Sequence, residues 1–407
     1  MAVTTKPLSL TLEQSIERAL SENPSLQAAR TWIDQAQGRR QQAGRLDNPE
    51  LKLDYSTDRT FNDEGERSYG FGFEQRFPIT NRLRLEKRIA LDEIELAHAE
   101  IENQIRILSQ RVATAYLQVV EAERQIALRE QLLVLYADFL DFVESRVETG
   151  EASMLEVHQV QIERYLVQQE MQALENAHIV QLSHFGQLIG LEAGVPVKLT
   201  FDFKLPSDLP SLVDFSPAML ESHPAYQMKA LLAQMAETQI SVEKASRWAD
   251  VALEIFYSEE RGVDAPNGAG RDRFFGVGVS IPLPLMDTKQ GAIAASRAKR
   301  QQFQFEVQAE AAKLIGDARM HRSQVKQLYQ QARAYDETLT QLVGQNIEEM
   351  TAGYTAGQIG LAEMFRAQGQ AFKIQSAQLS ILYDYEQALI DWKAATARQS
   401  HPTQVNL

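Results

Sequence analysis

The distribution of apolar positions along the chain predicts very long helices. Between about residues 81 and 148, apolar residues recur every seventh position at Ile126, Leu133, Leu140 and Val147, which is the repeat of a coiled coil. A helix of roughly 65 residues extends about 100 Å, far beyond the usual globular helix. We expect helices at about residues 11–44, 81–148, 153–189, 217–247, 288–355 and 361–396, with a short strand at 197–203.

Four other segments alternate between apolar residues and small or charged residues, which is the pattern of strands with two different faces. Leucine and aromatic residues alternate with charged residues, serine or glycine in residues 51–56 and 69–77, and residues 251–258 and 275–281 repeat this pattern. A strand of about 10 residues suits a tilted crossing of a bilayer. Alternation also fits a sheet in a soluble α+β protein. The joining loops, 62–68 and 262–272, are polar and rich in glycine.

The chain is a duplication. "VETGEASMLEV" in the first half matches "YTAGQIGLAEM" in the second, so that Gly150 aligns with Gly357 and Glu156 with Glu363. Because glycine reaches positive φ freely, both glycines predict a reversal between two helices. "YGFGFEQRFPI" matches "FGVGVSIPLPL" in the same order. We therefore divide the chain into a first repeat (1–190), a linker (191–216), a second repeat (217–396) and a C-terminal tail (397–407).

Composition removes several classes of function. The net charge is −14 without the basic patch that nucleic acid requires, so no nucleic-acid partner is expected. The absence of cysteine removes disulfides, thiolate metal sites and cysteine catalysis. The seven histidines form no zinc-enzyme motif, and the glycine pairs of the strands form no dinucleotide fingerprint. We therefore expect no enzyme, no metal site and no cofactor.

The sequence contains no apolar run long enough for a transmembrane helix. Its start, "MAVTTKPLSLT", lacks the regions of a signal peptide, so we expect either a cytosolic protein or a mature region with an added Met1. Four strands cannot close a membrane barrel without free edges, whereas three chains would supply twelve. If the sheet lies in a membrane, this is an argument for a trimer. The alternative is a soluble coiled-coil scaffold or adaptor whose small sheet forms a cap.

Several segments, in this order and twice over, resemble the TolC family of outer-membrane efflux channels, and in particular its CzcC/CusC-like heavy-metal branch. The resemblance covers about residues 8 to 396. The segments that carry it are "LTLEQSIERALSENPSLQAAR", "NPELKLDYS", "GFEQRFPITNRLRLEKRIA", "IPLPLMDTKQGAIAASRA", "RVETGEASMLEVHQVQ" and "GYTAGQIGLAEMFRAQ".

The resemblance implies an α+β membrane protein. Duplicated coiled-coil hairpins would form a periplasmic α-barrel, and four strands per chain would contribute to a 12-stranded β-barrel of a homotrimer in the outer membrane of a Gram-negative bacterium. The implied function is a passive exit duct for metal cations or small toxic compounds in a tripartite pump. Its partners would be a periplasmic adaptor, an inner-membrane pump of the RND type and outer-membrane lipid.

The resemblance also implies that the glycine turns are the periplasmic tips, where the channel closes and the adaptor docks. Glu363 and Glu156 match acidic positions of the constriction, and Tyr354 matches a tyrosine that holds the closed state. The chain departs from the pattern at Arg366, where relatives carry a second acidic residue, and at Ile359, where relatives can carry arginine. The docking residues would be Gly150, Glu151, Ser153, Gly357, Gly360 and Leu361.

Elementary electrostatics predicts which ions the constriction favours. Three copies of Glu363 around one axis would favour cations, and Glu348 and Glu349, about two turns before Gly357, could add to this ring. The alternative is that these carboxylates face water, and that Glu363 and Glu156 only favour the start of the return helices.

Overall fold

The structure is a computed structural model that describes residues 7–60, 64–192, 194–264, 268–335 and 337–398. Most of the expected tail, His401 and parts of both expected strand loops lie outside these residues. The chain forms two compact units. The tip unit comprises Met1–Arg30, Ile101–Pro224 and Ala311–Leu407, and the sheet unit comprises Thr31–Glu100 and Ala225–Glu310. Each unit combines parts of both expected repeats, whose boundaries stay a prediction.

The long helices have nearly the expected bounds, with one exception. Helix α3 (Arg82–Glu148) runs without interruption for 67 residues, and α4 (Met154–Leu188) and α9 (Leu361–Ala395) follow the two glycine turns. The expected helix at 288–355 is wrong, because it is divided into α7 (Gln290–Arg333) and α8 (Glu337–Thr355). At this division the amides of Ala334 and Tyr335 bond the carbonyls three residues earlier, which tightens the end of α7. Neither glycine nor proline marks the division, so helix propensity does not predict it.

Proline divides the two shorter helices that the sequence predicts as single elements. Helices α1 (Leu12–Glu22) and α2 (Pro24–Gln42) replace 11–44, and α5 (Pro217–Glu221) and α6 (Pro224–Ala245) replace 217–247. A residue before proline is disfavoured in the helical region, whereas proline itself suits the first helical position. Asn23 accordingly has an extended backbone, and its side chain accepts a hydrogen bond from the amide of Leu26 at 3.1 Å.

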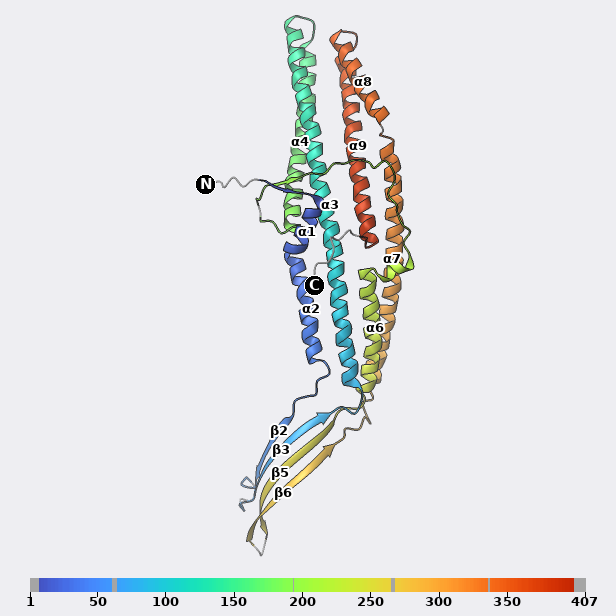
Figure 1. Cartoon of the computed structure of the whole chain (residues 1–407). Helices are drawn as coiled ribbons and strands as arrows, with labels where there is room; N and C mark the ends of the chain where they lie inside the picture. Colours follow the sequence, from blue (N-terminus) through green and yellow to red (C-terminus); the bar gives the residue numbers. More distant parts are fainter. Residues whose placement is uncertain (1–6, 61–63, 193, 265–267, 336, 399–407) are drawn as a thin grey trace. The chain divides into compact units, whose positions relative to one another are not determined.

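The tip unit holds two helical hairpins, α3/α4 and α8/α9, whose turns lie at the same end (Figure 1). A core cluster near the turns contains residues of both hairpins, including Phe139, Val143, Val157, Tyr354 and Met364. The heptad row inferred from the sequence is only half-buried. The adjacent row is buried instead, at Leu132, Tyr136, Phe139 and Val143.

A small parallel sheet in the tip unit joins distant parts of the chain. Strand β1 (Leu8–Leu10), which the sequence did not predict, pairs with β4 (Val197–Leu199), which is shorter than the expected strand at 197–203. The buried hydroxyl oxygen of Tyr116 in α3 lies 3.0 Å from the carbonyl oxygen of Leu10 and 2.9 Å from that of Thr200, and its one proton can be donated to either. This contact attaches the small sheet to the long helix.

The sheet unit contains four antiparallel strands in the order β2-β3-β5-β6 (Figure 1). Their bounds are Glu50–Thr57 for β2, Arg67–Phe77 for β3, Val251–Asp264 for β5 and Gly268–Ser280 for β6. The register places Leu53, Phe71, Tyr257 and Phe275 in one row, so the apolar positions of all four strands share a face. Leu53 and Phe275 are 74% and 76% exposed, so the described part of the chain leaves that face uncovered. Strands β2 and β6 form the two edges of the sheet.

Among the described residues, no helix combines the length and the apolar character that a membrane crossing requires.

Candidate functional site

Both glycine turns end their helices with the same hydrogen-bond pattern. After α3, the amide of Glu151 donates to the carbonyl of Arg146 at 2.8 Å and that of Gly150 to Val147 at 3.0 Å. After α8, the amide of Gln358 donates to Gly353 at 2.8 Å and that of Gly357 to Tyr354 at 2.9 Å. These pairs of bonds are Schellman motifs, which require a left-handed residue. Gly150 and Gly357 supply it, with φ of +80° and +72°.

The return helices begin differently in the two hairpins. The Ser153 hydroxyl caps α4 by accepting a hydrogen bond from the amide of Leu155 at 3.0 Å. Gly360, at the equivalent position before α9, offers no side chain for a cap. Glu156 and Glu363 both lie in a first helical turn, where a negative charge is favourable. The capping interpretation of these glutamates therefore fits the geometry.

Tyr354 links the two hairpins. Its ring is 3% exposed and lies 5.2 Å from the ring centroid of Phe139 and 6.1 Å from that of Phe142, both in α3. Its hydroxyl donates to Oε2 of Glu156 in α4 at 2.9 Å. A hydrogen bond to a carboxylate is stronger than one between neutral groups. The structure therefore brings together two of the residues inferred from the sequence.

Arg146 completes this group, and the sequence reasoning missed it. Its guanidinium carbon lies 5.6 Å from the ring centroid of Tyr354 and 5.9 Å from that of Phe142, within the range of cation–π attraction. Its Nε lies 3.5 Å from Oε2 of Glu151. The indication available in the sequence was a basic residue in the last turn before a tip glycine. We call Arg146, Glu151, Glu156 and Tyr354 the tip cluster.

Burial and the neighbouring Glu156 carboxylate raise the pKa of Tyr354 to about 12. Both causes favour the neutral phenol, which can donate a hydrogen bond. The contact with Glu156 therefore persists at neutral pH.

The remaining residues inferred from the sequence lie around this cluster. Leu361 is buried in the tip core, and Ile359 packs against the same core. The side chains of Glu348, Glu349 and Glu363 are exposed in the single chain, outside the tip cluster. Within the described part of the chain, no three histidine, aspartate or glutamate side chains come together as a metal-binding group.

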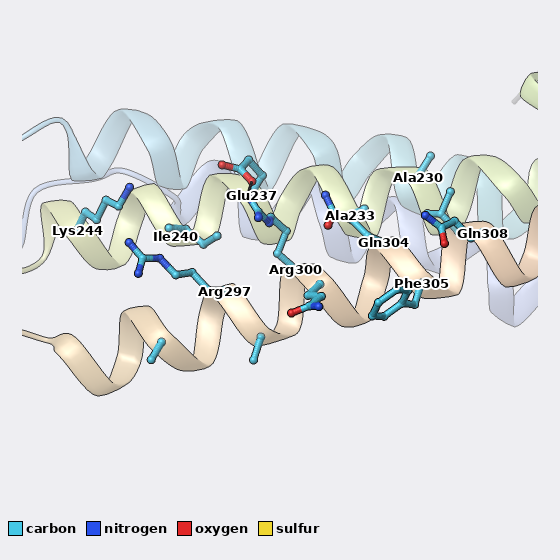
Figure 2. A pocket seen from close by; sticks show the side chains of 14 residues that line it. Ala230, Ala233, Glu237, Ile240, Lys244, Arg297, Arg300, Gln304, Phe305 and Gln308 are labelled. Carbon is cyan, nitrogen blue, oxygen red and sulfur yellow. Dashed lines mark hydrogen bonds and ion pairs between the residues drawn. The ribbon is translucent and has the colours of Figure 1, made fainter.

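The sheet unit carries an open groove between α6 and α7, with a volume of about 1320 Å³ (Figure 2). Its lining mixes apolar side chains such as Ile240 and Phe305 with charged ones. Arg300 of α7 pairs with Glu237 of α6 at 2.7 Å. The Phe305 ring is 60% exposed, so an apolar surface is available on this side of the unit.

Comparisons with known proteins agree with this geometry. The family described as outer membrane efflux protein matches residues 15–190. The cobalt-zinc-cadmium resistance protein CzcC of Cupriavidus metallidurans is 22% identical over 384 residues, which cover 93% of this chain and 88% of CzcC. Residues 15–190 thus match the outer membrane efflux protein family, and CzcC is similar over nearly the whole chain. The resemblance inferred from the sequence is thereby confirmed.

Solved structures of CusC and of the outer membrane protein VceC share the fold. CusC superposes with a TM-score of 0.77 at 17% identity, covering 95% of this chain and 91% of CusC. VceC of Vibrio cholerae superposes with a TM-score of 0.75 at 18% identity, covering 95% of each chain. The expected fold class, long helical hairpins with four strands, is confirmed. The family consists of efflux proteins rather than enzymes.

Proposed function

We propose that this chain is the outer-membrane exit duct of a tripartite efflux pump, a passive channel that opens at its tips. The sheet carries the proposal, because the apolar side chains of its four strands share one exposed face. Exposed apolar surface of this kind marks a contact with lipid or with another protein. The match of residues 15–190 to the outer membrane efflux protein family favours lipid, and it gives no support to the alternative of a soluble scaffold.

The channel is proposed to be a homotrimer. In lipid, every backbone polar group of a sheet must be paired, so the free edges at β2 and β6 require neighbouring strands. Three copies joined edge to edge would provide 12 strands in a closed barrel. The groove between α6 and α7, with its exposed Phe305, would receive helices of the next copy.

The tip cluster is proposed to hold the channel closed. The bond between Tyr354 and Glu156 ties α8 to α4, and Arg146 lies against the Tyr354 ring. Separation of the hairpins would break both contacts. A periplasmic adaptor would dock on the adjacent turns, at Gly150, Glu151, Ser153, Gly357, Gly360 and Leu361.

Metal cations are the proposed cargo, with small toxic compounds as the second candidate. The relative CzcC is named for resistance to cobalt, zinc and cadmium. The exposed carboxylates of Glu348, Glu349 and Glu363 would form a ring that attracts cations when three copies meet. An inner-membrane pump of the RND type would supply the energy.

Planar bilayer recordings of detergent-extracted protein test the channel. We expect a cation-selective conductance from a trimer, and we expect Glu363→Ala to lower the cation preference. Monomeric protein without conductance would contradict the proposed function. An unchanged reversal potential in Glu363→Ala would remove only this residue from the constriction.

Deletion of the gene tests the cargo. We expect greater sensitivity to cobalt, zinc or cadmium salts, restored by the intact gene. Unchanged metal tolerance together with altered tolerance of dyes or antibiotics would contradict the metal assignment and favour small toxic compounds.

A further inference from the structure

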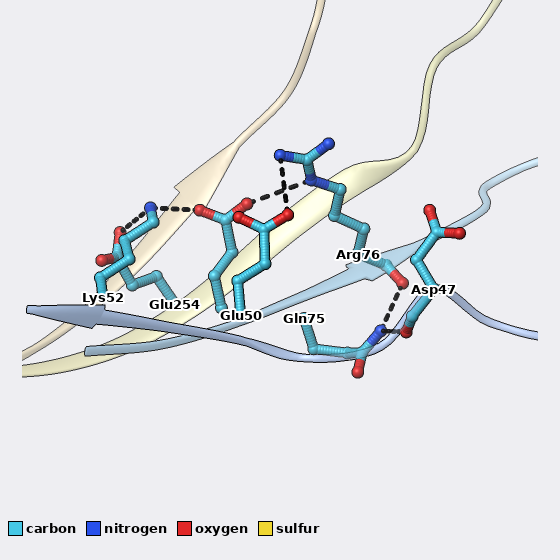
Figure 3. Close-up of polar contacts among 7 residues, drawn as sticks. Asp47, Glu50, Lys52, Gln75, Arg76 and Glu254 are labelled. Carbon is cyan, nitrogen blue, oxygen red and sulfur yellow. Dashed lines mark hydrogen bonds and ion pairs between the residues drawn. The ribbon is translucent and has the colours of Figure 1, made fainter.

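The polar face of the sheet carries a continuous network of charges (Figure 3). Lys52 of β2 pairs with Glu74 of β3, and its Nζ lies 3.4 Å from Oε2 of Glu254 in β5. On the other side of Glu74, Arg76 approaches Glu74 at 3.2 Å and Glu50 at 3.6 Å. The network therefore joins three strands through alternating charges.

The register explains why these carboxylates meet. Glu50 lies opposite Glu74, and Glu74 lies opposite Glu254, so three carboxylates form one row across β2, β3 and β5. Like charges directly opposite one another are destabilising. Lys52 and Arg76 flank the row and offset that repulsion. The Glu74 side chain, at the centre, is only 10% exposed, whereas those of Glu50 and Glu254 are 57% and 29% exposed.

Glycines beneath the network keep it close to the backbone. A Cβ atom added to Gly72 would lie 2.9 Å from Oε1 of Glu254, and one added to Gly276 would lie 2.5 Å from the Phe256 ring. Any larger residue would displace these side chains. The Glu254 carboxylate and the Phe256 ring therefore lie over these glycines, close to the strands.

The duplicated hairpins carry opposite charges at equivalent positions. Gly72 and Gly278 match in the two repeats, and their partners across the hairpins are Lys52 and Glu254. An exact repeat would place like charges at these positions. Instead, the first hairpin carries a cation and the second an anion, and the two lie within 3.4 Å of each other.

The network as a whole is acidic. Its three glutamates outnumber Lys52 and Arg76, which leaves one net negative charge per chain. If the apolar face meets lipid, the polar face lines the interior of the barrel, where rings of charged side chains select ions. Three copies would repeat the excess charge around that interior.

We propose that this row, Glu50, Glu74 and Glu254 with Lys52 and Arg76, is a second selectivity-determining element, located at the level of the sheet. It rests on the proposed channel function and acts in addition to the glutamates near the tips. Lys52 and Arg76 moderate its charge, so that cations are preferred but not retained. The balance between these two basic side chains and the three carboxylates sets how strongly the sheet prefers permeating cations.

Bilayer recordings of the assembled trimer under a salt gradient test this inference. Lys52→Gln raises the excess negative charge, and Glu254→Gln removes it. The cation preference, measured as the reversal potential, is expected to fall in the order Lys52→Gln, wild type, Glu254→Gln. Arg76→Gln should shift the potential in the same direction as Lys52→Gln, which keeps the test decisive if Lys52→Gln fails to assemble.

Two controls separate local charge from other effects. Glu259→Gln removes a carboxylate from the opposite face of β5, where Glu259 pairs with Arg273 at 3.1 Å, and should leave the reversal potential unchanged. The double variant K52E/E254K retains the net charge and should keep the wild-type value. Equal reversal potentials in conducting wild type, Lys52→Gln and Glu254→Gln would overturn this inference alone. Absence of conductance in the wild type would overturn the channel function and this inference together.

Discussion

The hydroxyl of Tyr354 makes one bond that joins residues 198 positions apart in the chain. The sequence indicates both partners, Tyr354 and Glu156, through the repeat and the family resemblance. It does not indicate their contact, because that contact depends on how two hairpins pack. The sequence does not indicate Arg146 for the same reason, because its role depends on its contact with the Tyr354 ring.

Removal of this hydroxyl should favour the open channel. Tyr354→Phe keeps the ring in its aromatic cluster and deletes only the hydrogen bond to a carboxylate, which contributes about 1.5–3 kcal/mol. We expect the open fraction in bilayer recordings to rise roughly tenfold or more. Tyr165→Phe, at an exposed tyrosine of α4, is the matched control and should change nothing. A wild-type open fraction in Tyr354→Phe would remove the bond from the closing contact.

Alkaline pH should act on the same bond. The pKa of Tyr354 is raised to about 12 in the folded state, above its usual value of 10.0, so its stabilising contribution is complete below pH 10. The contribution is lost as the pH rises from 10 towards 12. We expect opening to increase over this range in the wild type, and the increase should be smaller in Tyr354→Phe. Parallel pH profiles would contradict this assignment.

Acid should destabilise the tip unit through His223. This side chain is fully buried, and burial together with the nearby Arg106 lowers its pKa from 6.5 to about 4. Its stabilising contribution is complete above pH 6.5 and is lost as the pH falls towards 4. The shift corresponds to a change of about 3 kcal/mol in the free energy of unfolding.

We expect melting temperatures to fall between pH 7 and 5 less steeply in His223→Asn than in the wild type. His184→Asn, at an exposed histidine, should retain the wild-type slope, and a wild-type slope in His223→Asn would contradict the assignment.

At the scale of elements, sequence periodicity predicts the long helices and the strands well. Regular side-chain spacing and glycine turns are local properties, and α3, α4 and α9 begin and end within two residues of their expected bounds. The division between α7 and α8 was missed because no local residue marks it. The breaks at Pro24 and Pro224 were readable in principle from the rule on residues before proline.

Two glycine substitutions near one tip should have opposite effects. Gly357→Ala forces a side chain into a left-handed conformation, which costs about 1–2 kcal/mol, and no neighbouring atom adds to that cost. Gly344→Ala, within α8, should instead stabilise the helix by about 1 kcal/mol. Hydrogen exchange of the α8 amides measures both. A change in helix stability of the same sign in both variants would contradict the Schellman assignment.

At the scale of the whole molecule, edge pairing between copies can be tested directly because the chain has no cysteine. Leu53→Cys on β2 is combined in turn with Phe275→Cys, Val277→Cys or Val279→Cys on β6. With a short thiol cross-linker, we expect covalent dimers and trimers from at least one pair. Leu53→Cys combined with Tyr257→Cys, on the interior strand β5, should give none. Absence of intermolecular products from all three pairs would contradict a barrel closed between β2 and β6.

The sequence by itself determined the duplication, the long helices, the two-faced strands and the positions of both tip turns. These properties follow from side-chain periodicity and from the backbone freedom of glycine, which act over a few residues. Only the tertiary structure decided which distant residues meet: Tyr354 with Glu156 at the tips, and Lys52 with Glu74 and Glu254 in the sheet. Such contacts depend on the packing of hairpins and on strand register, and no local pattern specifies either of them.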